Sequence, residues 1–225
     1  MGVHQLEVLD DVEAVHNRGA ELIREKARFA YNERSAFGLA VSGGKDPWPM
    51  FSQLEDGDLP WAATEIFQVD ERVAPPGSDE RNLTHLIESL SIGAQGSIRP
   101  MPVTDDDLDA AADRYAASLP EAIDLAHLGI GPDGHTASLV PGDPVLEVTD
   151  KRVAVTAGEY QGARRMTLTY PELQRTRSLL WVVTGEEKVD ALRKLVDQDP
   201  STPSGRVQPG GESVILADRA AAPDA

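Results

Sequence analysis

The stretch AIDLAHLGIGPDGHTASL, residues 122–139, decides the fold and holds the first candidate for chemistry. Its first half is short and mostly apolar, which is typical of a strand buried on both faces of a parallel sheet. Three glycines come next, at positions 129, 131 and 134. Glycine allows unusual backbone angles and lets a ligand approach main-chain amides. Because open α/β sheets bind ligands beyond the carboxyl ends of their strands, His135 is expected at a ligand-binding edge.

His135 by itself does not establish a catalytic site. A histidine after a glycine loop is more often a turn residue or a helix cap than a catalyst. Asp133 adds little, because Asp-Gly is also a common turn pair. The hypothesis therefore depends on the residues at the ends of the other predicted strands.

The segment FGLAV, residues 37–41, predicts a buried strand that runs into Ser42, Gly43 and Gly44. Pro47 then opens a helix. A strand, a glycine pair and a helix start are typical of an anion site, since free amides and the positive helix end point at the ligand. A glycine-rich turn without a ligand fits the same residues.

Two more predicted strands end in charged or polar residues. Residues 65–69 lead into Asp70, Glu71 and Arg72, which could equally form a surface salt-bridge cluster. Residues 178–184 end at Thr184, and Gly185 leads into a helix with Lys188 in its first turn. A lysine there opposes the helix dipole, as a cation facing an anionic ligand would, although a solvated lysine is the commoner case.

The remaining pattern alternates between strands and helices. A helix is expected from Asp10 or Asp11 to about Asn32, and helices are also expected at residues 82–90 and 105–118. Further strands are expected at residues 4–9, 97–103, 152–156 and 213–216. The three acidic residues 105–107 favour the helix dipole over metal binding, because adjacent carboxylates cannot all face one ion.

This order predicts an α/β fold with a mostly parallel, Rossmann-like sheet and helices on both faces. Residues 1–225 contain no repeat and no long linker, so we expect one α/β domain, with or without a small lobe. The four strand ends at Ser42, Asp70, Gly131 and Thr184 can then gather on one rim. Glycine amides, a carboxylate, a histidine and two or three cations at that rim predict a site for a small phosphorylated molecule.

The net charge of the chain limits the classes of binding partner that we expect. There are 21 Lys plus Arg against 38 Asp plus Glu, a formal net charge of −17. Such a surface repels nucleic acid and anionic membranes, so neither is an expected partner. A phosphate site must therefore be built from a few local cations and amides. The acidity, with Arg favoured over Lys, also suggests a hypothesis that the cell interior is salty.

The compartment is expected to be the cytoplasm. The chain has no cysteine, which excludes disulfides, thiolate catalysis and sulfur-ligated metal sites. The N-terminus MGVHQLEVLDDVEAV has neither a basic leader nor an apolar signal core, and no segment has the length of a membrane span. Nothing in the sequence determines the oligomeric state, for which a monomer or a weak dimer is expected.

Four motifs in order resemble those of the 6-phosphogluconolactonases. They are WAATEIFQVDERVAPPGSDERN, LGIGPDGHTASLVPGDP, RRMTLTYPEL and LLWVVTGEEKVDAL, and ILADRAA near the C-terminus adds a weaker similarity. The resemblance covers residues from about 41 to 192. It implies a hydrolase of the oxidative pentose phosphate pathway that opens 6-phospho-D-glucono-1,5-lactone without a cofactor or a required metal. It also implies the fold of the glucosamine-6-phosphate deaminases.

The resemblance further implies residue roles. His135 would act as general base on the attacking water and then return the proton to the ring oxygen. Asp70, Arg72 and Asp133 would line the pocket and orient His135 or the sugar. The phosphate would be held by Ser42, Gly43, Gly44, Arg165 and Lys188. Arg72 would also bind the substrate.

Two departures from the family pattern affect the phosphate site. Asp46 stands where the family's first loop usually has a threonine, so its carboxylate must turn away from the phosphate or pair with Lys45. The segment AGEYQGAR also lacks the family's proline-rich character. Arg165 is favoured over Arg164 only because it directly precedes MTLT.

Two other functions compete with the lactonase. A glucosamine-6-phosphate deaminase usually carries a glutamate five residues after its histidine, where this chain has Val140. It also favours Asp-Glu-Tyr where this chain has Asp70-Glu71-Arg72. Both differences favour the lactonase. A non-catalytic sugar-phosphate sensor would keep the same binding residues and differ only in turnover.

Overall fold

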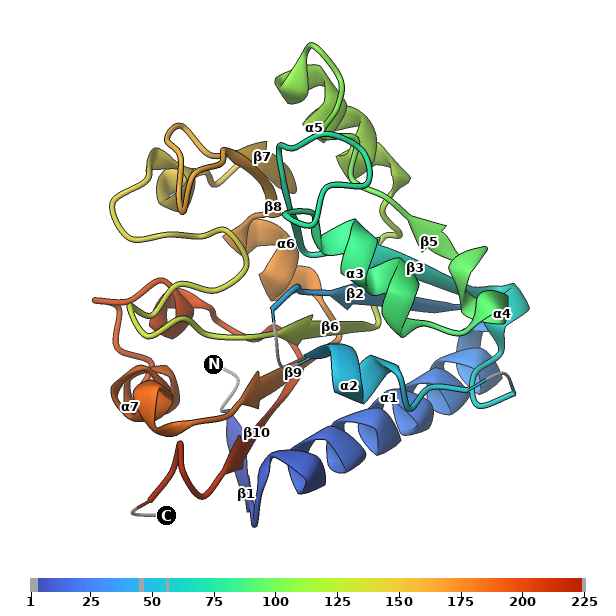
Figure 1. Cartoon of the computed structure of the whole chain (residues 1–225), viewed down its shortest axis with the longest axis vertical. Coiled ribbons are helices and arrows are strands. Elements are labelled where there is room, and N and C mark those ends of the chain that lie inside the picture. The colour runs from blue at the N-terminus through green and yellow to red at the C-terminus, as the bar shows by residue number, and fades with distance from the viewer. Residues whose placement is uncertain (1–3, 45–46, 56, 224–225) are drawn as a thin grey trace.

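The computed structural model describes residues 4–44, 47–55 and 57–223, and a seven-stranded parallel sheet forms its centre (Figure 1). The strand order is β1-β10-β9-β6-β2-β3-β5, and every pair is parallel. The prediction of a mostly parallel α/β sheet is therefore confirmed. The strands are β1 (Gln5–Leu9), β2 (Phe37–Val41), β3 (Thr64–Gln68), β5 (Ile98–Arg99), β6 (Leu125–Leu128), β9 (Ser178–Val183) and β10 (Glu212–Asp218).

Helices cover both faces of this sheet, and alternate strand residues feed two separate cores. In β9, for example, Leu180 and Val182 belong to one core while Leu179, Trp181 and Val183 belong to the other. The first core packs under α1 (Val12–Arg34), α2 (Pro47–Phe51), α3 (Asn82–Ser89) and α4 (Ile92–Gln95). The second packs under α5 (Leu108–Ser118), α6 (Tyr170–Arg175) and α7 (Val189–Val196). Burial on both faces explains why these strands are apolar at consecutive positions.

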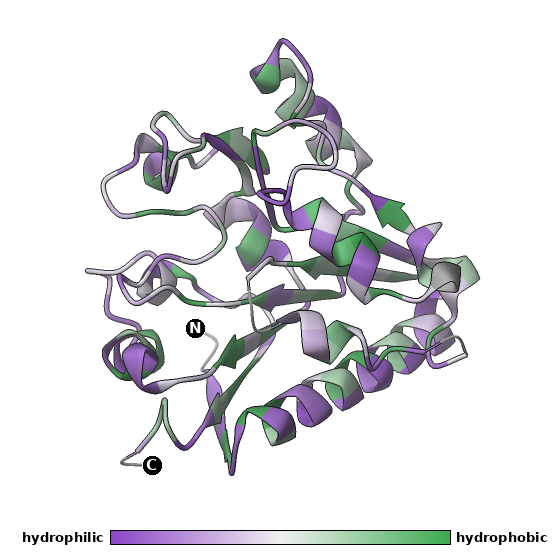
Figure 2. Ribbon diagram, viewed as in Figure 1, coloured by the Kyte–Doolittle hydropathy of each residue, from purple (hydrophilic) through white to green (hydrophobic). Residues whose placement is uncertain are grey.

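The long helix α1 shows why the local sequence folds as it does. Asp11 caps its first turn, since the carboxylate accepts a hydrogen bond from the Ala14 amide at 2.8 Å. Ser35 ends it in the left-handed conformation, with a φ of 55°. One side of α1 packs on β9 and β10, and the outer side is hydrophilic in Figure 2. The predicted start at Asp10 or Asp11 agrees with this cap.

A second, three-stranded antiparallel sheet was not expected from the sequence. It consists of β4 (Asp70–Arg72), β8 (Arg165–Leu168) and β7 (Val153–Val155), in the order β4-β8-β7. The residues that the sequence placed at the exit of β3 are thus a strand of their own. A three-residue strand has no readable periodicity, and its pairing depends on main-chain hydrogen bonds to a segment far along the chain.

Other boundaries differ less. The predicted strand at residues 97–103 is reduced to Ile98–Arg99. Helix α5 begins at Leu108 rather than at Asp105, because Asp107 is its N-cap and accepts from the Ala110 amide at 3.0 Å. In the described part of the chain, no helix combines the length and apolar composition needed to cross a bilayer.

Candidate active site

The carboxyl ends of β2, β6 and β9 and the strands β4 and β8 surround one cavity of about 330 Å³. Three of the four predicted strand ends line it, at Ser42, Asp70 and Gly131. The fourth, Thr184, does not line it, and Val182, Glu187 and Lys188 represent β9 and its exit instead. Among the residues that the sequence singled out, the cavity brings together Ser42, Gly43, Gly44, Asp70, Arg72, His135, Arg165 and Lys188.

His135 is held by a compact loop after β6. The Gly131 amide donates to the His135 carbonyl at 2.9 Å, and Gly134 has a φ of 81°, which only glycine adopts without strain. A Cβ on Gly131 would lie 2.0 Å from His135 Nδ1. The glycines therefore give the imidazole the space it occupies.

The two nitrogens of the His135 ring have different surroundings. Nδ1 lies 2.6 Å from Asp133 Oδ1 and 3.3 Å from the Tyr160 hydroxyl. Nε2 has no hydrogen-bond partner among the described residues. A carboxylate next to Nδ1 favours the tautomer with the proton on Nδ1, which leaves the lone pair of Nε2 available.

Asp133 is ionised in this arrangement. Burial alone would raise its pKa, but the hydrogen bond and charge of His135 outweigh burial and hold the pKa below its usual value. Asp133 also accepts hydrogen bonds from the His135 amide and from Tyr160. It does not line the cavity, so of the two alternatives predicted for it the structure favours contact with His135 over contact with the sugar.

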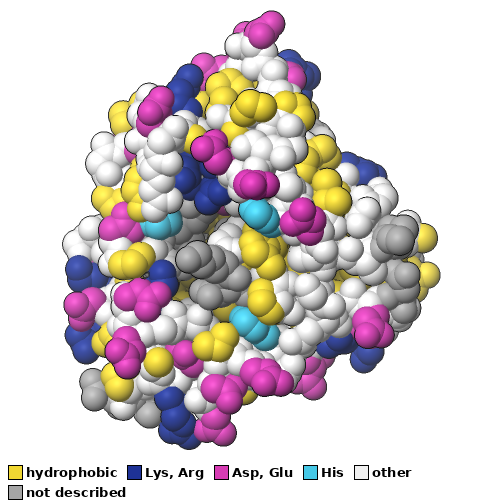
Figure 3. Space-filling model, viewed as in Figure 1, with side chains coloured by type: hydrophobic (Ala, Val, Ile, Leu, Met, Phe, Trp, Pro, Cys, Tyr) yellow, Lys and Arg dark blue, Asp and Glu magenta, His cyan; other side chains and the backbone are white. Residues whose placement is uncertain are grey.

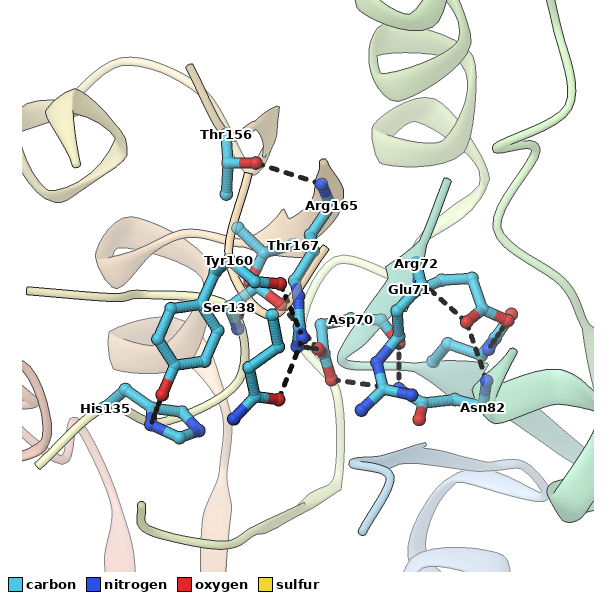
Figure 4. Close-up of polar contacts among 12 residues, drawn as sticks. Asp70, Glu71, Arg72, Asn82, His135, Ser138, Thr156, Tyr160, Arg165 and Thr167 are labelled. Atoms are coloured by element: carbon cyan, nitrogen blue, oxygen red, sulfur yellow. Dashed lines mark hydrogen bonds and ion pairs between the residues drawn. The ribbon is translucent and has the colours of Figure 1, made fainter. Parts of the chain in front are cut away.

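Asp70 belongs to a different cluster. Its carboxylate accepts from the Ser138 hydroxyl at 2.6 Å and from the Asn82 amide at 3.4 Å, and it lies 4.0 Å from Arg165 Nη1 (Figure 4). Within the described residues, no hydrogen bond or ion pair joins it to His135. Of the two roles expected for Asp70, these contacts do not support orienting His135; orienting the sugar stays a prediction, and the contact with Arg165 was not expected.

The glycine loop after β2 is fixed from both sides. The Ser42 amide donates to the His127 carbonyl at 3.2 Å, and a Cβ on Gly43 would lie only 1.9 Å from Asn82 Oδ1. The Ser42 hydroxyl oxygen is buried without a partner among the described residues. A glycine at position 43 is thus needed for α3 to approach, and Ser42 keeps a hydrogen-bonding group for a ligand. Asp46 and Lys45, for which either a turn away from the phosphate or a mutual pairing was expected, lie outside the described residues.

Three cations line the cavity. Burial lowers the pKa of Arg165 and the charge of Arg72 lowers it further, while Asp70 opposes the change. Arg72 donates to the Glu80 carbonyl at 2.6 Å, and its Nε, like that of Arg165, has no partner among the described residues. Within the same described residues, Lys188 forms no ion pair. All three retain donors for an anion.

Arg164 does not take part in this site. It is exposed, and its Nε donates to the Thr156 carbonyl at 3.1 Å. Arg165, in contrast, is 4% exposed and lines the cavity. The side chains of neighbouring residues in a strand point to opposite faces, which explains the separation.

Glu71 supports the site from the protein interior, whereas the sequence indicated it only as part of a charged strand end or a surface salt-bridge cluster. It is fully buried and accepts from the amides of Asn82 and Leu83 at 2.8 and 2.9 Å, and from Arg81 Nε at 3.2 Å. Helix α3 has no side-chain cap of its own, so this carboxylate from β4 caps it.

Four further residues at the site were missed. Asn82 braces Asp70, and Gln161 and Glu187 line the cavity beside Arg165 and Lys188. Tyr160 contacts His135 and Asp133. The sequence did contain one usable signal, since the glycine at position 162 favours a tight turn next to Tyr160.

Arginine and lysine side chains line the cavity of a chain whose net charge is negative. Figure 3 shows acidic side chains spread over this face, with Lys and Arg side chains and a histidine at the rim of the central hollow. In the part of the chain that is described, no three His, Asp or Glu side chains are grouped as a metal site would require. The local positive charge is suited to an anionic ligand, although the chain as a whole is negative.

Comparisons with known proteins agree on one family. The family model described as glucosamine-6-phosphate isomerases/6-phosphogluconolactonase matches residues 10–216. The 6-phosphogluconolactonase of Nostoc sp. is 34% identical over 233 residues, covering 96% of each chain, and that of Synechocystis sp. is 33% identical with the same coverage. The crystal structure of 6-phosphogluconolactonase from Thermotoga maritima has a TM-score of 0.86 at 26% identity, covering 96% of this chain and 99% of that one. A monomeric glucosamine-6-phosphate deaminase shares the fold, with a TM-score of 0.84 at 17% identity.

Proposed function

The chain belongs to the glucosamine-6-phosphate isomerase/6-phosphogluconolactonase family, and from this premise we propose that it hydrolyses 6-phospho-D-glucono-1,5-lactone to 6-phosphogluconate with His135 as general base. Relatives named 6-phosphogluconolactonase support lactone hydrolysis in the pentose phosphate pathway. The catalytic assignment rests on one observation. A histidine whose Nε2 has no hydrogen-bond partner among the described residues, and whose Nδ1 contacts a carboxylate, lines the same cavity as Arg165 and Lys188.

Hydrolysis needs little more than a positioned base. His135 Nε2 takes a proton from water as the water oxygen bonds to the lactone carbonyl carbon. Asp133 stabilises the resulting imidazolium through its ion pair with Nδ1. When the tetrahedral intermediate collapses, the bond to the ring oxygen breaks and that oxygen takes the proton back from Nε2. Because a lactone is an activated ester, a base contributing about 10²–10⁴ in rate, together with positioning, accounts for the reaction.

The cations and the glycine loop bind the phosphate in this proposal. Arg165 offers a planar fork for two phosphate oxygens and Lys188 a point charge. The loop of Ser42, Gly43 and Gly44 contributes amides and the Ser42 hydroxyl, which has no partner in the described part of the chain. Arg72 lies next to Arg165, because the two are register partners across β4 and β8.

The deaminase alternative needs a glutamate at position 140. Val140 is a buried apolar residue, with 6% exposure, at the position where that chemistry needs a glutamate. Arg72 takes the place of the tyrosine. The similarity to the deaminase structure is a similarity of fold alone. The site residues favour lactone hydrolysis.

The deciding experiment replaces His135 with alanine. We expect kcat for 6-phosphogluconolactone to fall about 10²–10⁴-fold once the spontaneous opening rate is subtracted, while 6-phosphogluconate binding by calorimetry is retained. His85→Ala, at a partly exposed histidine outside the cavity, is the matched control. A His135→Ala variant as active as the parent would remove the base from the mechanism. A parent that binds without turnover would identify a sensor, and ammonia release from glucosamine 6-phosphate would identify a deaminase.

A further inference from the structure

Tyr160 lies at the tip of a tight hairpin between β7 and β8. Its amide donates to the Ala163 carbonyl at 3.0 Å, and the two residues form an isolated antiparallel bridge. Gln161 and Gly162 between them have φ values of 53° and 85°. Two successive residues with positive φ are typical of the type I′ turn, the tightest connection that matches the twist of a hairpin. The backbone therefore holds the Tyr160 side chain in a defined direction.

The tyrosine side chain contacts both the candidate base and the candidate phosphate cation (Figure 4). Its hydroxyl lies 3.1 Å from Asp133 Oδ2 and 3.3 Å from His135 Nδ1, and the two rings meet edge to face with centroids 5.1 Å apart. On the other side, the Arg165 guanidinium carbon lies 5.1 Å from the ring centroid. Arg165 Nη2 also donates to the Tyr160 carbonyl at 3.1 Å.

The donors and acceptors of this cluster fit only one arrangement well. Burial and the charge of Asp133 raise the pKa of Tyr160, so its hydroxyl stays protonated and can donate. Asp133 accepts from Tyr160 through Oδ2 and from His135 through Oδ1. With both carboxylate oxygens engaged, Asp133 cannot rotate, and the imidazole it holds keeps Nε2 toward the cavity.

We propose that Tyr160 is a positioning residue for this reaction, because its hydroxyl fixes Asp133 against His135 and its ring supports Arg165. This inference rests on the proposed function of the same site. Tyr160 does not line the cavity, so it acts through its neighbours rather than on the substrate. It also joins two parts of the site that lie 30 residues apart in sequence, His135 and Arg165, through one side chain.

Tyr160→Phe and Tyr160→Ala separate the two contacts. Phenylalanine keeps the ring and removes the hydroxyl, so we expect kcat to fall about 3- to 10-fold with KM nearly unchanged. Alanine also removes the ring, so we expect the same loss in kcat and a KM about 2- to 5-fold higher, which phenylalanine restores. Tyr31→Phe, at an exposed tyrosine of α1, is the matched control and should behave as the parent.

The pH profile distinguishes positioning from a structural effect. Without the hydroxyl, Asp133 keeps more of its negative charge for His135 and stabilises the imidazolium more strongly. The acid limb of kcat/KM in Tyr160→Phe should therefore move to higher pH. The titration of the His135 ring, followed by proton NMR and assigned with His135→Ala, should move in the same direction, and this measurement does not need turnover.

The outcomes separate this inference from the proposed function. If the parent is active, His135→Ala is inactive and Tyr160→Phe is unchanged, the positioning role of Tyr160 is overturned and the proposed function stands. A lower kcat without a change in the His135 titration would also overturn it, since the hydroxyl would then act on the substrate. A parent that does not open the lactone would instead overturn the proposed function.

Discussion

At the scale of single residues, chemically similar side chains of the cavity differ in their surroundings. His135 and His127 both line the cavity, yet only His135 has a carboxylate on one ring nitrogen. His127 is 1% exposed, and neither of its nitrogens has a partner among the described residues. Environment rather than residue type therefore separates the proposed base from a buried histidine of the pocket wall.

Arg165 and Lys188 are expected to recognise phosphate rather than the sugar ring. Replacing either with alanine should raise KM for 6-phosphogluconolactone about 10- to 100-fold, because a charge-assisted contact is lost. KM for unphosphorylated gluconolactone should change much less. Initial rates on both lactones measure the difference. Arg164→Ala, which removes a neighbouring guanidinium outside the cavity, should leave both values unchanged, and equal effects of Arg165→Ala on both substrates would contradict phosphate recognition.

His127 should make the fold sensitive to acid. Burial, with a smaller contribution from His16, lowers its pKa from 6.5 to about 3. The folded protein keeps it neutral while the unfolded chain protonates it below pH 6.5. Its contribution to stability is therefore complete above pH 6.5 and is lost as the pH falls toward 3, by about 1.4 kcal/mol per pH unit.

Urea unfolding of the parent and of His127→Leu between pH 7 and pH 5 tests this. The free energy of unfolding of the variant should fall about 2 kcal/mol less over the range from pH 6.5 to pH 5. Parallel pH dependences in the two proteins would show that His127 does not carry the effect.

At the scale of elements, loops at strand ends place the groups and neighbouring elements lock them. The glycine loop after β6 makes room for the His135 ring, and Glu71 of β4 caps α3. Helix α3 in turn brings Asn82 against both Asp70 and the position of Gly43. The glycine loop after β2 and the Asp70 cluster thus both contact the helix that this buried carboxylate caps.

Gly131→Ala should disable the base without unfolding the protein. The new Cβ would overlap the His135 ring and Asp133 Oδ1, at 2.0 and 2.6 Å, so the imidazole must move. We expect kcat to fall about 10²-fold, as a displacement near 1 Å can cause, with little change in melting temperature. Gly96→Ala, where an added Cβ meets nothing within 4 Å, serves as control. Normal turnover in Gly131→Ala would mean that the ring tolerates displacement.

At the scale of the whole molecule, the net charge of −17 opposes the compact state. Screening by salt should therefore stabilise it. We expect the melting temperature at neutral pH to rise by about 4–8 °C between 0.1 and 2 M KCl, if screening relieves about 2 kcal/mol. Differential scanning calorimetry measures this.

The salt effect should shrink as the pH approaches the pI of about 4.6, where the self-repulsion is small. A melting temperature that does not rise with salt at neutral pH would contradict the hypothesis of a salt-adapted protein. The same screening should weaken phosphate binding, because the cations of the cavity act by charge.

The sequence by itself determined the parallel sheet and the local part of the site. Apolar runs of strand length, glycine exits and capped helices are local patterns, and most of the elements expected from them are observed, some with shifted boundaries. Asp133 and His135 are only two residues apart, so a glycine loop alone can bring them together. The family motifs added an activity that the residues alone left open.

Only the tertiary structure decided which cations meet that histidine and which contacts support them. Arg72 and Arg165 become neighbours because β4 pairs with β8, and Tyr160 reaches Asp133 because a turn of two left-handed residues directs it there. Glu71 is a further example, since its buried carboxylate caps helix α3, which begins eleven residues later in the sequence. Contacts between segments distant in sequence are set by packing and strand pairing, and a three-residue strand or a single buried carboxylate has no periodicity from which they could be read.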